Sequence, residues 1–294
     1  MVLSVSILAA LIFSATGVTI IQPVDGETYS GNWLPLRAIV ENDNQLPDSV
    51  LYSLNGGDLT DIPRLNTDWY TYMASDLHTG FSESPAPTDN TVLWTAPVTG
   101  MTHEFCSPVI VNGVVYQVSD QQSMVYALDA ATGSILWQYD VIDHVDDAVT
   151  YYDGMVYVAA DSAWCLDANT GSRIWAFKPS PMYKMNGTPA LDDGVAYFSF
   201  APDGSSMVII ALDAYTGIEI WNTPLSSYST GCITLHDEYI YAPTYNGLLY
   251  ALDASDGSVL WTNSSAGSGY WDSSPVVVDG VIYICDFDGY ARAI

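Results

Sequence analysis

The chain has 294 residues, of which 49% are hydrophobic and 13% aromatic, so it can bury a large core and is not intrinsically disordered. Six Lys and Arg residues against 34 Asp and Glu residues give a net charge of −28, which disfavours non-specific binding to nucleic acids and to anionic membranes. The composition therefore predicts a globular, strongly acidic protein whose surface attracts cations.

The first 17 residues have the pattern of an export signal. Residues 2–13 are apolar and uncharged, and the small residues 14–17 follow them. This pattern predicts a signal peptide over 1–17, with an uncleaved anchor or a buried strand as alternatives. Export implies an extracellular, cell-surface or periplasmic location, and the anchor would be the only contact with a membrane. Glycosylation sequons occur at Asn186 and Asn263.

Residues 18–66 contain short apolar runs interrupted by Gly, Pro and Asn, which predicts a small β-rich segment. Its sequence VLYSLNGG (50–57) resembles a strand of the immunoglobulin-like surface modules of bacteria and archaea. The segment is too short for a complete sandwich, so we expect it to pack against another surface. Residues 67–87 then lead into a repeat region at 88–294.

One ten-residue phrase recurs four times in this region, as LDAATGSILW (128–137), LDANTGSRIW (166–175), LDAYTGIEIW (212–221) and LDASDGSVLW (252–261). In the first repeat, two strands flank Asn112-Gly113 and two more flank a turn at 129–133, which makes four strands per repeat. Repeats of about 40 residues built from four short strands predict an all-β protein, a β-propeller of four-stranded blades.

The two ends of the repeat region complement each other. The segment 271–294 supplies three strands, and TVLW (91–94) has the pattern of a fourth. We therefore predict a closed five-bladed ring in which residues 91–94 pair with residues 289–293. The alternative is a fragment of a seven- or eight-bladed ring.

The ten-residue phrase resembles the PQQ-like repeat of quinoprotein dehydrogenases, which also occurs in secreted propellers that bind no quinone. The lead-in at 67–87, with Trp69, Asp76 and His78-Thr79-Gly80, is similar to that of archaeal and bacterial members. The resemblance implies that each repeat tryptophan docks on a repeat glycine of a neighbouring blade. The docking residues are then Trp94, Trp137, Trp175, Trp221, Trp261, Gly133, Gly171, Gly217 and Gly257.

The loops between the second and third strands of the blades predict a binding face. Each carries an acidic or amide group, and a propeller gathers such loops at one mouth of its channel. The predicted residues are Asp120, Asp161, Asp203, Asn246, Asp286 and Asp288. Their alternative role is to form tight turns. DHVDD (143–147) predicts a Ca²⁺ site formed by Asp143, Asp146 and Asp147, although its spacing matches no EF-hand loop.

No arrangement of residues in the sequence predicts catalysis. The four cysteines lie in four different blades without metal-ligand spacing, and Cys165 aligns with Ala127, which predicts a packing thiol. The propeller holds four cationic residues, too few to predict a site for the three carboxylates of pyrroloquinoline quinone (PQQ). We therefore predict an exported, non-catalytic scaffold that uses no cofactor and binds a protein or glycan partner. The alternatives are a PQQ-dependent quinoprotein dehydrogenase and an envelope factor resembling the barrel-assembly propeller lipoprotein.

Overall fold

The computed structural model divides into two compact units, Met1–Asn66 and Thr67–Ile294. The described residues are 7–11, 17–22, 37–41, 50–54, 60–61, 71, 87, 89–98, 107–119, 123–142, 145, 147–179, 184–185, 187–201, 205–229, 231–264, 269–270 and 273–294. These residues form strands and turns without a helix, and thus no helix among them could cross a membrane. The all-β prediction is confirmed.

The smaller unit contains two antiparallel sheets. One has the strand order β1 (Ile7–Leu11), β4 (Val50–Leu54) and β5 (Thr60–Asp61), and the other pairs β2 (Gly17–Gln22) with β3 (Arg37–Glu41). Strand β1 lies within the stretch for which the sequence predicted a signal peptide or an anchor. Export, anchoring and the immunoglobulin-like character of this unit stay predictions.

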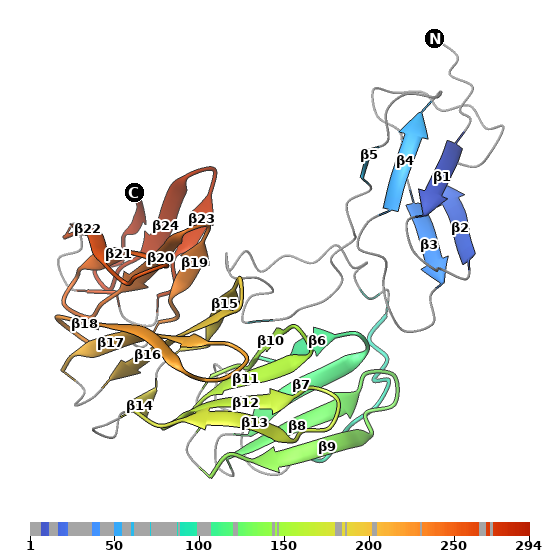
Figure 1. Ribbon diagram of the computed structural model, residues 1–294, viewed down its shortest axis with the longest axis horizontal. Coiled ribbons are helices and arrows are strands. Elements are labelled where there is room, and N and C mark those ends of the chain that lie inside the picture. The colour runs from blue at the N-terminus through green and yellow to red at the C-terminus, as the bar shows by residue number, and fades with distance from the viewer. Residues whose placement is uncertain are drawn as a thin grey trace. The chain divides into compact units, whose positions relative to one another are not determined.

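The larger unit contains five successive antiparallel sheets, shown from green to red in Figure 1, which we call blades 1 to 5. Within each blade the main strands pair in chain order, as the repeats predicted. Blade 1 contains β6 (Val109–Val111), β7 (Val114–Ser119), β8 (Met124–Asp129) and β9 (Ile135–Asp140). Blade 2 contains β10 (Thr150–Tyr152), β11 (Met155–Ala159), β12 (Ala163–Asp167) and β13 (Arg173–Phe177). Blade 3 contains β15 (Ala190–Asp192), β16 (Val195–Ala201), β17 (Met207–Asp213) and β18 (Glu219–Leu225), and β14 (Lys184–Met185) also pairs with β16. Blade 4 contains β19 (Thr234–His236), β20 (Tyr239–Pro243), β21 (Leu249–Asp253) and β22 (Val259–Asn263). Blade 5 contains β23 (Val276–Val278), β24 (Val281–Cys285) and β25 (Ala291–Ala293).

The first hairpin of blade 1 shows why the local prediction works. Asn112 and Gly113 have φ angles of 51° and 75°, and positive φ at both central residues gives a turn whose twist matches that of the flanking strands. The second turn is held by an aspartate, because Asp129 Oδ1 accepts hydrogen bonds from the backbone N–H of Thr132 and from its hydroxyl, both at 2.8 Å. The same bonds recur at Asp167 and Asp213. The repeated phrase is therefore a turn with its own hydrogen-bonded framework.

Tryptophans join neighbouring blades. Trp137 of blade 1 packs so closely on Gly171 of blade 2 that a Cβ atom at Gly171 would lie 2.6 Å from Cδ2 of the indole. A side chain at this glycine would therefore displace the ring. The same arrangement joins Trp94 to Gly133, Trp175 to Gly217 and Trp221 to Gly257.

Each of these contacts is reinforced by hydrogen bonds to one backbone carbonyl. Trp137 Nε1 donates to Ala168 O at 2.8 Å, and the Tyr116 hydroxyl donates to the same oxygen at 3.3 Å. Burial raises the pKa of Tyr116, so the phenol remains a neutral donor. Equivalent pairs are Trp175 with Tyr157 on Ala214 O, and Trp221 with Tyr197 on Ala254 O.

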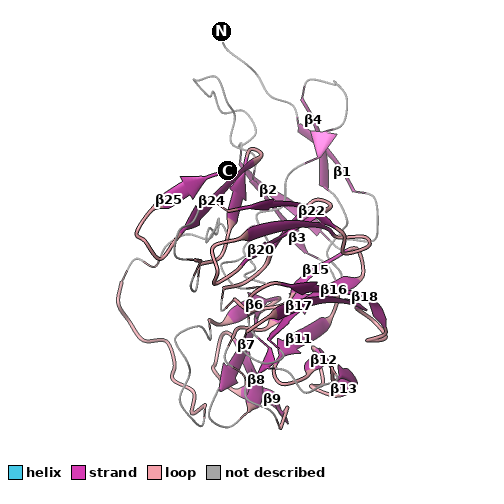
Figure 2. Ribbon diagram, turned by 90° about the vertical axis from the view of Figure 1, so that its left-hand side faces the viewer, coloured by secondary structure: helices cyan, strands magenta, loops and turns pink. Residues whose placement is uncertain are grey.

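The prediction that residues 91–94 close the ring by pairing with residues 289–293 is wrong. Among the described strands β25 pairs with β24 alone (Figure 2). Residues 91–94 form no strand. Val92 and Leu93 are 72% and 86% exposed, whereas Trp94 docks on Gly133 and its Nε1 donates to Ala130 O at 2.9 Å. The contact with blade 1, and not sheet pairing with blade 5, fixes the position of this segment.

Candidate functional site

One edge of the blades gathers two kinds of loop. Because strand direction alternates, the loop between the second and third strands and the connection to the next blade leave the same edge of each sheet. We call this edge the loop face. Of the six residues predicted on it, Asp120 and Asp203 lie outside the described residues, and the structure describes Asp161, Asn246, Asp286 and Asp288.

Asp286 has a structural role that the sequence did not predict. Its carboxylate is buried, forms an ion pair with Arg292 and accepts the Tyr290 N–H at 2.9 Å. Burial opposes ionisation of Asp286, but the bonds from Tyr290 and Arg292 outweigh it and lower the pKa of the carboxyl. The Arg292 guanidinium in turn lies 5.5 Å from the centre of the Tyr290 ring. The Asp286 carboxylate therefore stabilises blade 5 by binding Arg292 and the Tyr290 backbone.

Only one of the three predicted calcium ligands can be placed. Asp143 and Asp146 lie outside the described residues, whereas Asp147 is buried and accepts the Gly187 N–H at 2.8 Å. This bond joins the connection before blade 2 to the connection before blade 3. Among the described residues no group of three His, Cys, Asp or Glu side chains is placed to hold a metal ion. The calcium site stays a prediction.

The described cysteines are free thiols. Cys165 is buried opposite Trp175, and burial raises its pKa to about 12. Cys232 is also buried, accepts the Thr188 N–H at 3.4 Å and has a pKa raised to about 12 by burial. Both thiols are protonated at neutral pH and are poor nucleophiles. Of the glycosylation acceptors, Asn263 ends β22 and Asn186 lies outside the described residues.

Thr71 shows a contact of the lead-in segment that the sequence did not reveal. It is buried, and its hydroxyl lies 2.9 Å from that of Thr150 in β10, the first strand of blade 2. Thr150 donates its own hydroxyl to Pro189 O, next to the first strand of blade 3, at 2.6 Å. One described residue of the lead-in thus lies against the first strands of the blades.

Two exposed aromatic residues on the loop face were also missed. Tyr245 and Phe287 occupy equivalent positions in the turns Thr244-Tyr245-Asn246-Gly247 and Asp286-Phe287-Asp288-Gly289 of blades 4 and 5. An aromatic residue followed by Asn or Asp and then Gly in both repeats was the available signal. The predicted binding face included the acidic and amide residues of these loops but not their aromatic neighbours.

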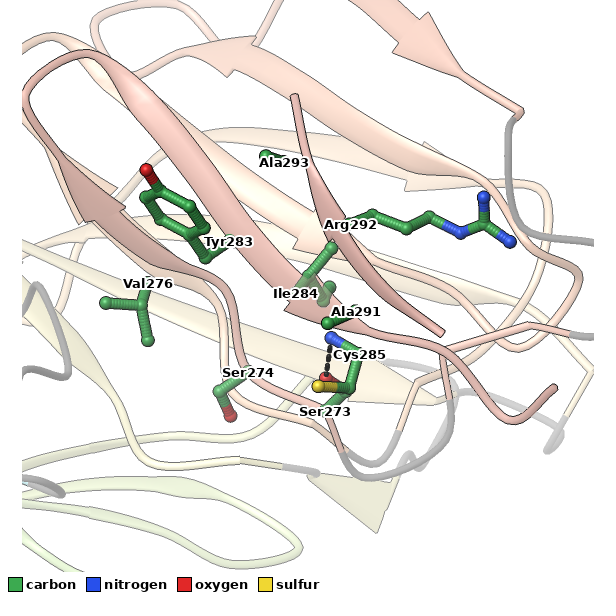
Figure 3. Close-up of a pocket in the computed structure, with 9 residues that line it drawn as sticks. All are labelled: Ser273, Ser274, Val276, Tyr283, Ile284, Cys285, Ala291, Arg292 and Ala293. Atoms are coloured by element: carbon green, nitrogen blue, oxygen red, sulfur yellow. Dashed lines mark hydrogen bonds between the residues drawn. The ribbon is translucent and has the colours of Figure 1, made fainter. Parts of the chain in front are cut away.

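A cavity of about 460 Å³ lies on one face of blade 5 (Figure 3). Val276, Tyr283, Cys285 and Ala293 line it, and Ser273 Oγ accepts the Cys285 N–H at 3.2 Å. Tyr283 is 49% exposed, whereas the equivalent tyrosines of blades 1 to 3 are buried against the next blade. Those tyrosines are Tyr116, Tyr157 and Tyr197. The cavity therefore corresponds to a surface that a neighbouring blade covers elsewhere in the unit. Ser273, Ser274 and Arg292 also line it, and Arg292 is already paired with Asp286.

Repeated four-stranded blades, aspartate-held turns and tryptophan–glycine docking define a PQQ-like repeat β-propeller. Residues 84–231 and 205–294 match the family model described as outer membrane protein assembly factor BamB. Since these matches cover more than half of the sequence, the chain belongs to this family.

The chain is similar to several larger proteins. It is 25% identical to tetrathionate hydrolase of Acidithiobacillus ferrooxidans over 211 residues, which cover 60% of this chain and 41% of the relative. It is 35% identical to BamB of Yersinia pestis over 106 residues, which cover 32% of this chain and 26% of the relative as aligned. The solved structure of the quinohemoprotein alcohol dehydrogenase from Comamonas testosteroni matches 79% of this chain and 50% of its own, with a TM-score of 0.62 and 19% identity. The chain thus spans half or less of these proteins, and the structural likeness shows the propeller fold.

Proposed function

We propose that this protein is a non-catalytic β-propeller that serves as a binding or scaffold module in a cell envelope or at a cell surface. Its partner is a protein or a glycan. The observation that carries the proposal is the placement of the cationic side chains. A site for PQQ needs cationic groups or strong donors to offset the desolvation of three carboxylates.

The described arginines of the propeller do not fit that requirement. Arg173 lies in β13, the last strand of blade 2, where it is exposed and sits 5.9 Å from the centre of the Trp164 ring. Arg292 is paired with Asp286. Lys178 lines a separate cavity beside Phe177 and Glu219. Arg173 and Lys178 belong to blade 2 and Arg292 belongs to blade 5. Arg173 lies over Trp164, Lys178 lines its own cavity and Arg292 is paired, so these three side chains form no common group of donors for a tricarboxylate.

A PQQ-dependent dehydrogenase is the alternative from another class, because the relatives include enzymes of that description. Isothermal titration calorimetry with PQQ, in the presence and absence of Ca²⁺, separates the two. The proposal expects no saturable heat of quinone binding under either condition. Stoichiometric binding of the quinone would contradict it. Binding of Ca²⁺ without the quinone would be compatible with the non-catalytic proposal. The Asp146→Asn variant would then test whether the predicted site binds the ion.

The family match favours a second candidate within the binding class, an envelope assembly factor. Cross-linking in the native envelope followed by mass spectrometry tests this candidate. It expects a β-barrel outer-membrane assembly component among the cross-linked partners. Recovery of unrelated partners alone would refute it and would leave the broader scaffold proposal in place.

A further inference from the structure

The loop face of blades 4 and 5 carries two turns of the same construction. In blade 4 the Gly247 N–H donates to Thr244 O at 3.1 Å, and in blade 5 the Gly289 N–H donates to Asp286 O at 3.1 Å. The residue after the first position is aromatic in both turns. The next residue, Asn246 or Asp288, is exposed and polar. Each turn therefore presents a flat apolar ring beside a hydrogen-bonding group.

The turn of blade 4 is held rigidly. The Tyr245 N–H donates to Tyr228 O at 2.8 Å, and the two tyrosine rings stack with centres 5.2 Å apart and planes 13° from parallel. Asn246 Nδ2 donates to Ser226 Oγ at 3.0 Å, and that hydroxyl lies 2.7 Å from the Tyr250 hydroxyl. Tyr245 is nevertheless 39% exposed, so the stacked pair forms a fixed aromatic surface.

The turn of blade 5 repeats this anchoring. The Phe287 N–H donates to Gly269 O at 3.0 Å, as the Tyr245 N–H does to Tyr228 O. Phe287 is 69% exposed. Phe287 thus lies exposed at the tip of an anchored loop, where its ring can contact a ligand.

Gly269 places the two turns side by side. Its carbonyl bonds Phe287, and its Cα packs against the Tyr245 carbonyl so closely that any Cβ atom there would clash. The backbone of one turn is thus in direct contact with the residue that anchors the other. An extended ligand that contacts Tyr245 can therefore reach Phe287 without rearrangement of either loop.

We propose that Tyr245 and Phe287, with Asn246 and Asp288, form two adjacent subsites for a neutral carbohydrate chain. Aromatic side chains offer flat contact area at low entropic cost, and the apolar face of a pyranose ring matches it. The Asn246 amide donates to Ser226 Oγ and accepts the Thr244 hydroxyl at 2.8 Å, which leaves its second N–H for a sugar hydroxyl, and the carboxylate of Asp288 can accept from another. The inference rests on the proposed binding function and names the ligand class.

Charge selects among carbohydrates. The net charge of −28 and the carboxylate of Asp288 disfavour uronic-acid and sulfated polymers. Two subsites on one ligand also raise affinity through effective concentration, so a longer oligosaccharide binds more tightly than a disaccharide.

Affinity electrophoresis of the full chain through native gels containing hydroxyethylcellulose, galactomannan or mannan tests the proposal, with alginate as the anionic comparison. We expect retardation in at least one neutral gel and none in alginate. Tyr245→Ala and Phe287→Ala should each weaken binding about tenfold, equivalent to about 1.4 kcal/mol. Tyr239→Ala is the matched control, because Tyr239 lies in the same blade, is also 39% exposed and sits at the opposite end of β20.

Absence of retardation in every neutral gel would overturn the carbohydrate subsites. So would equal losses for Tyr239→Ala and Tyr245→Ala. Neither outcome touches the non-catalytic proposal, which depends on quinone binding. If the quinone binds stoichiometrically and the gels still show retardation, the proposed function fails and the carbohydrate site stands.

Discussion

Replacing Gly171 by alanine tests how tightly neighbouring blades are joined. Gly171 has a φ of 68°, and the added Cβ atom would lie 2.6 Å from the Trp137 ring. Gly154, in the same blade, provides a matched control. Its φ is 78°, and an added Cβ atom would meet no atom within 4 Å. The two substitutions share the backbone strain and differ in the contact with tryptophan.

The magnitudes follow from these geometries. Alanine in the left-handed region costs about 1–2 kcal/mol, and both variants incur this cost. Overpacking at Gly171 adds about 1–3 kcal/mol. Displacement of the indole also strains the bond from Trp137 Nε1 to Ala168 O, which is 2.8 Å long in a buried site. We therefore expect Gly171→Ala to lower the free energy of unfolding by about 2 kcal/mol more than Gly154→Ala does.

Urea denaturation followed by tryptophan fluorescence measures this difference. The midpoint of Gly171→Ala should fall clearly below that of Gly154→Ala, with similar slopes for both variants. Equal midpoints would refute the reasoning, because they would mean that the indole moves aside without cost and that docking does not hold the blades together.

Three further predictions concern the core, the thiols and the acid range. Trp175→Ala should lower the free energy of unfolding by about 3–5 kcal/mol, because the ring is buried and bonded; an unchanged urea midpoint would argue against a packing role. A thiol reagent should modify the exposed Cys285 in the native protein, and Cys165 and Cys232 only after unfolding, as read by peptide mapping. The reason is that burial shields Cys165 and Cys232 and raises the pKa of both thiols to about 12. Labelling of all three thiols at the same rate in the native protein would contradict the burial of Cys165 and Cys232. Hydrogen bonds from Thr216 lower the pKa of Asp213 in the folded protein below its unfolded value of about 3.9. The ionised Asp213 therefore stabilises the fold at neutral pH, and this stabilisation is lost as the pH falls below about 4 and through the folded pKa. The urea midpoint should drop over that range, with a smaller drop for Asp213→Asn, and a midpoint independent of pH would contradict this linkage.

The blade and its turns could be predicted from sequence because their determinants are local. Asn112-Gly113 sets a hairpin by its own backbone preferences, and Asp129 holds its turn through bonds within four residues. Alternation of apolar residues then gives the strands. Each signal lies within one repeat and recurs in the others, so the repeats support one another.

Ring closure could not be predicted in this way. Matching strand deficits at 91–94 and 289–293 show what could pair, but not how far each blade rotates relative to the next. That rotation depends on side-chain packing between sheets. The docking of Trp94 on Gly133 is satisfied without any pairing to β25, and the sequence does not rank these two contacts.

The loop face was predicted only in part for a related reason. Asp286 and Asp288 lie in the same turn, yet Arg292 engages Asp286, six residues away, whereas Asp288 stays exposed. The choice depends on a neighbour in the next strand. Counting every acidic residue at these turns therefore overestimates the number of carboxylates available to a ligand.

Whether the propeller is catalytic can be measured by reconstituting it with PQQ and Ca²⁺ and assaying dye-linked dehydrogenase activity with alcohols and aldoses as donors. For a non-catalytic propeller we expect dye reduction equal to that of protein-free controls for every donor. Saturable, donor-dependent reduction that disappears when Ca²⁺ is chelated would contradict it and would make the protein a quinoprotein dehydrogenase.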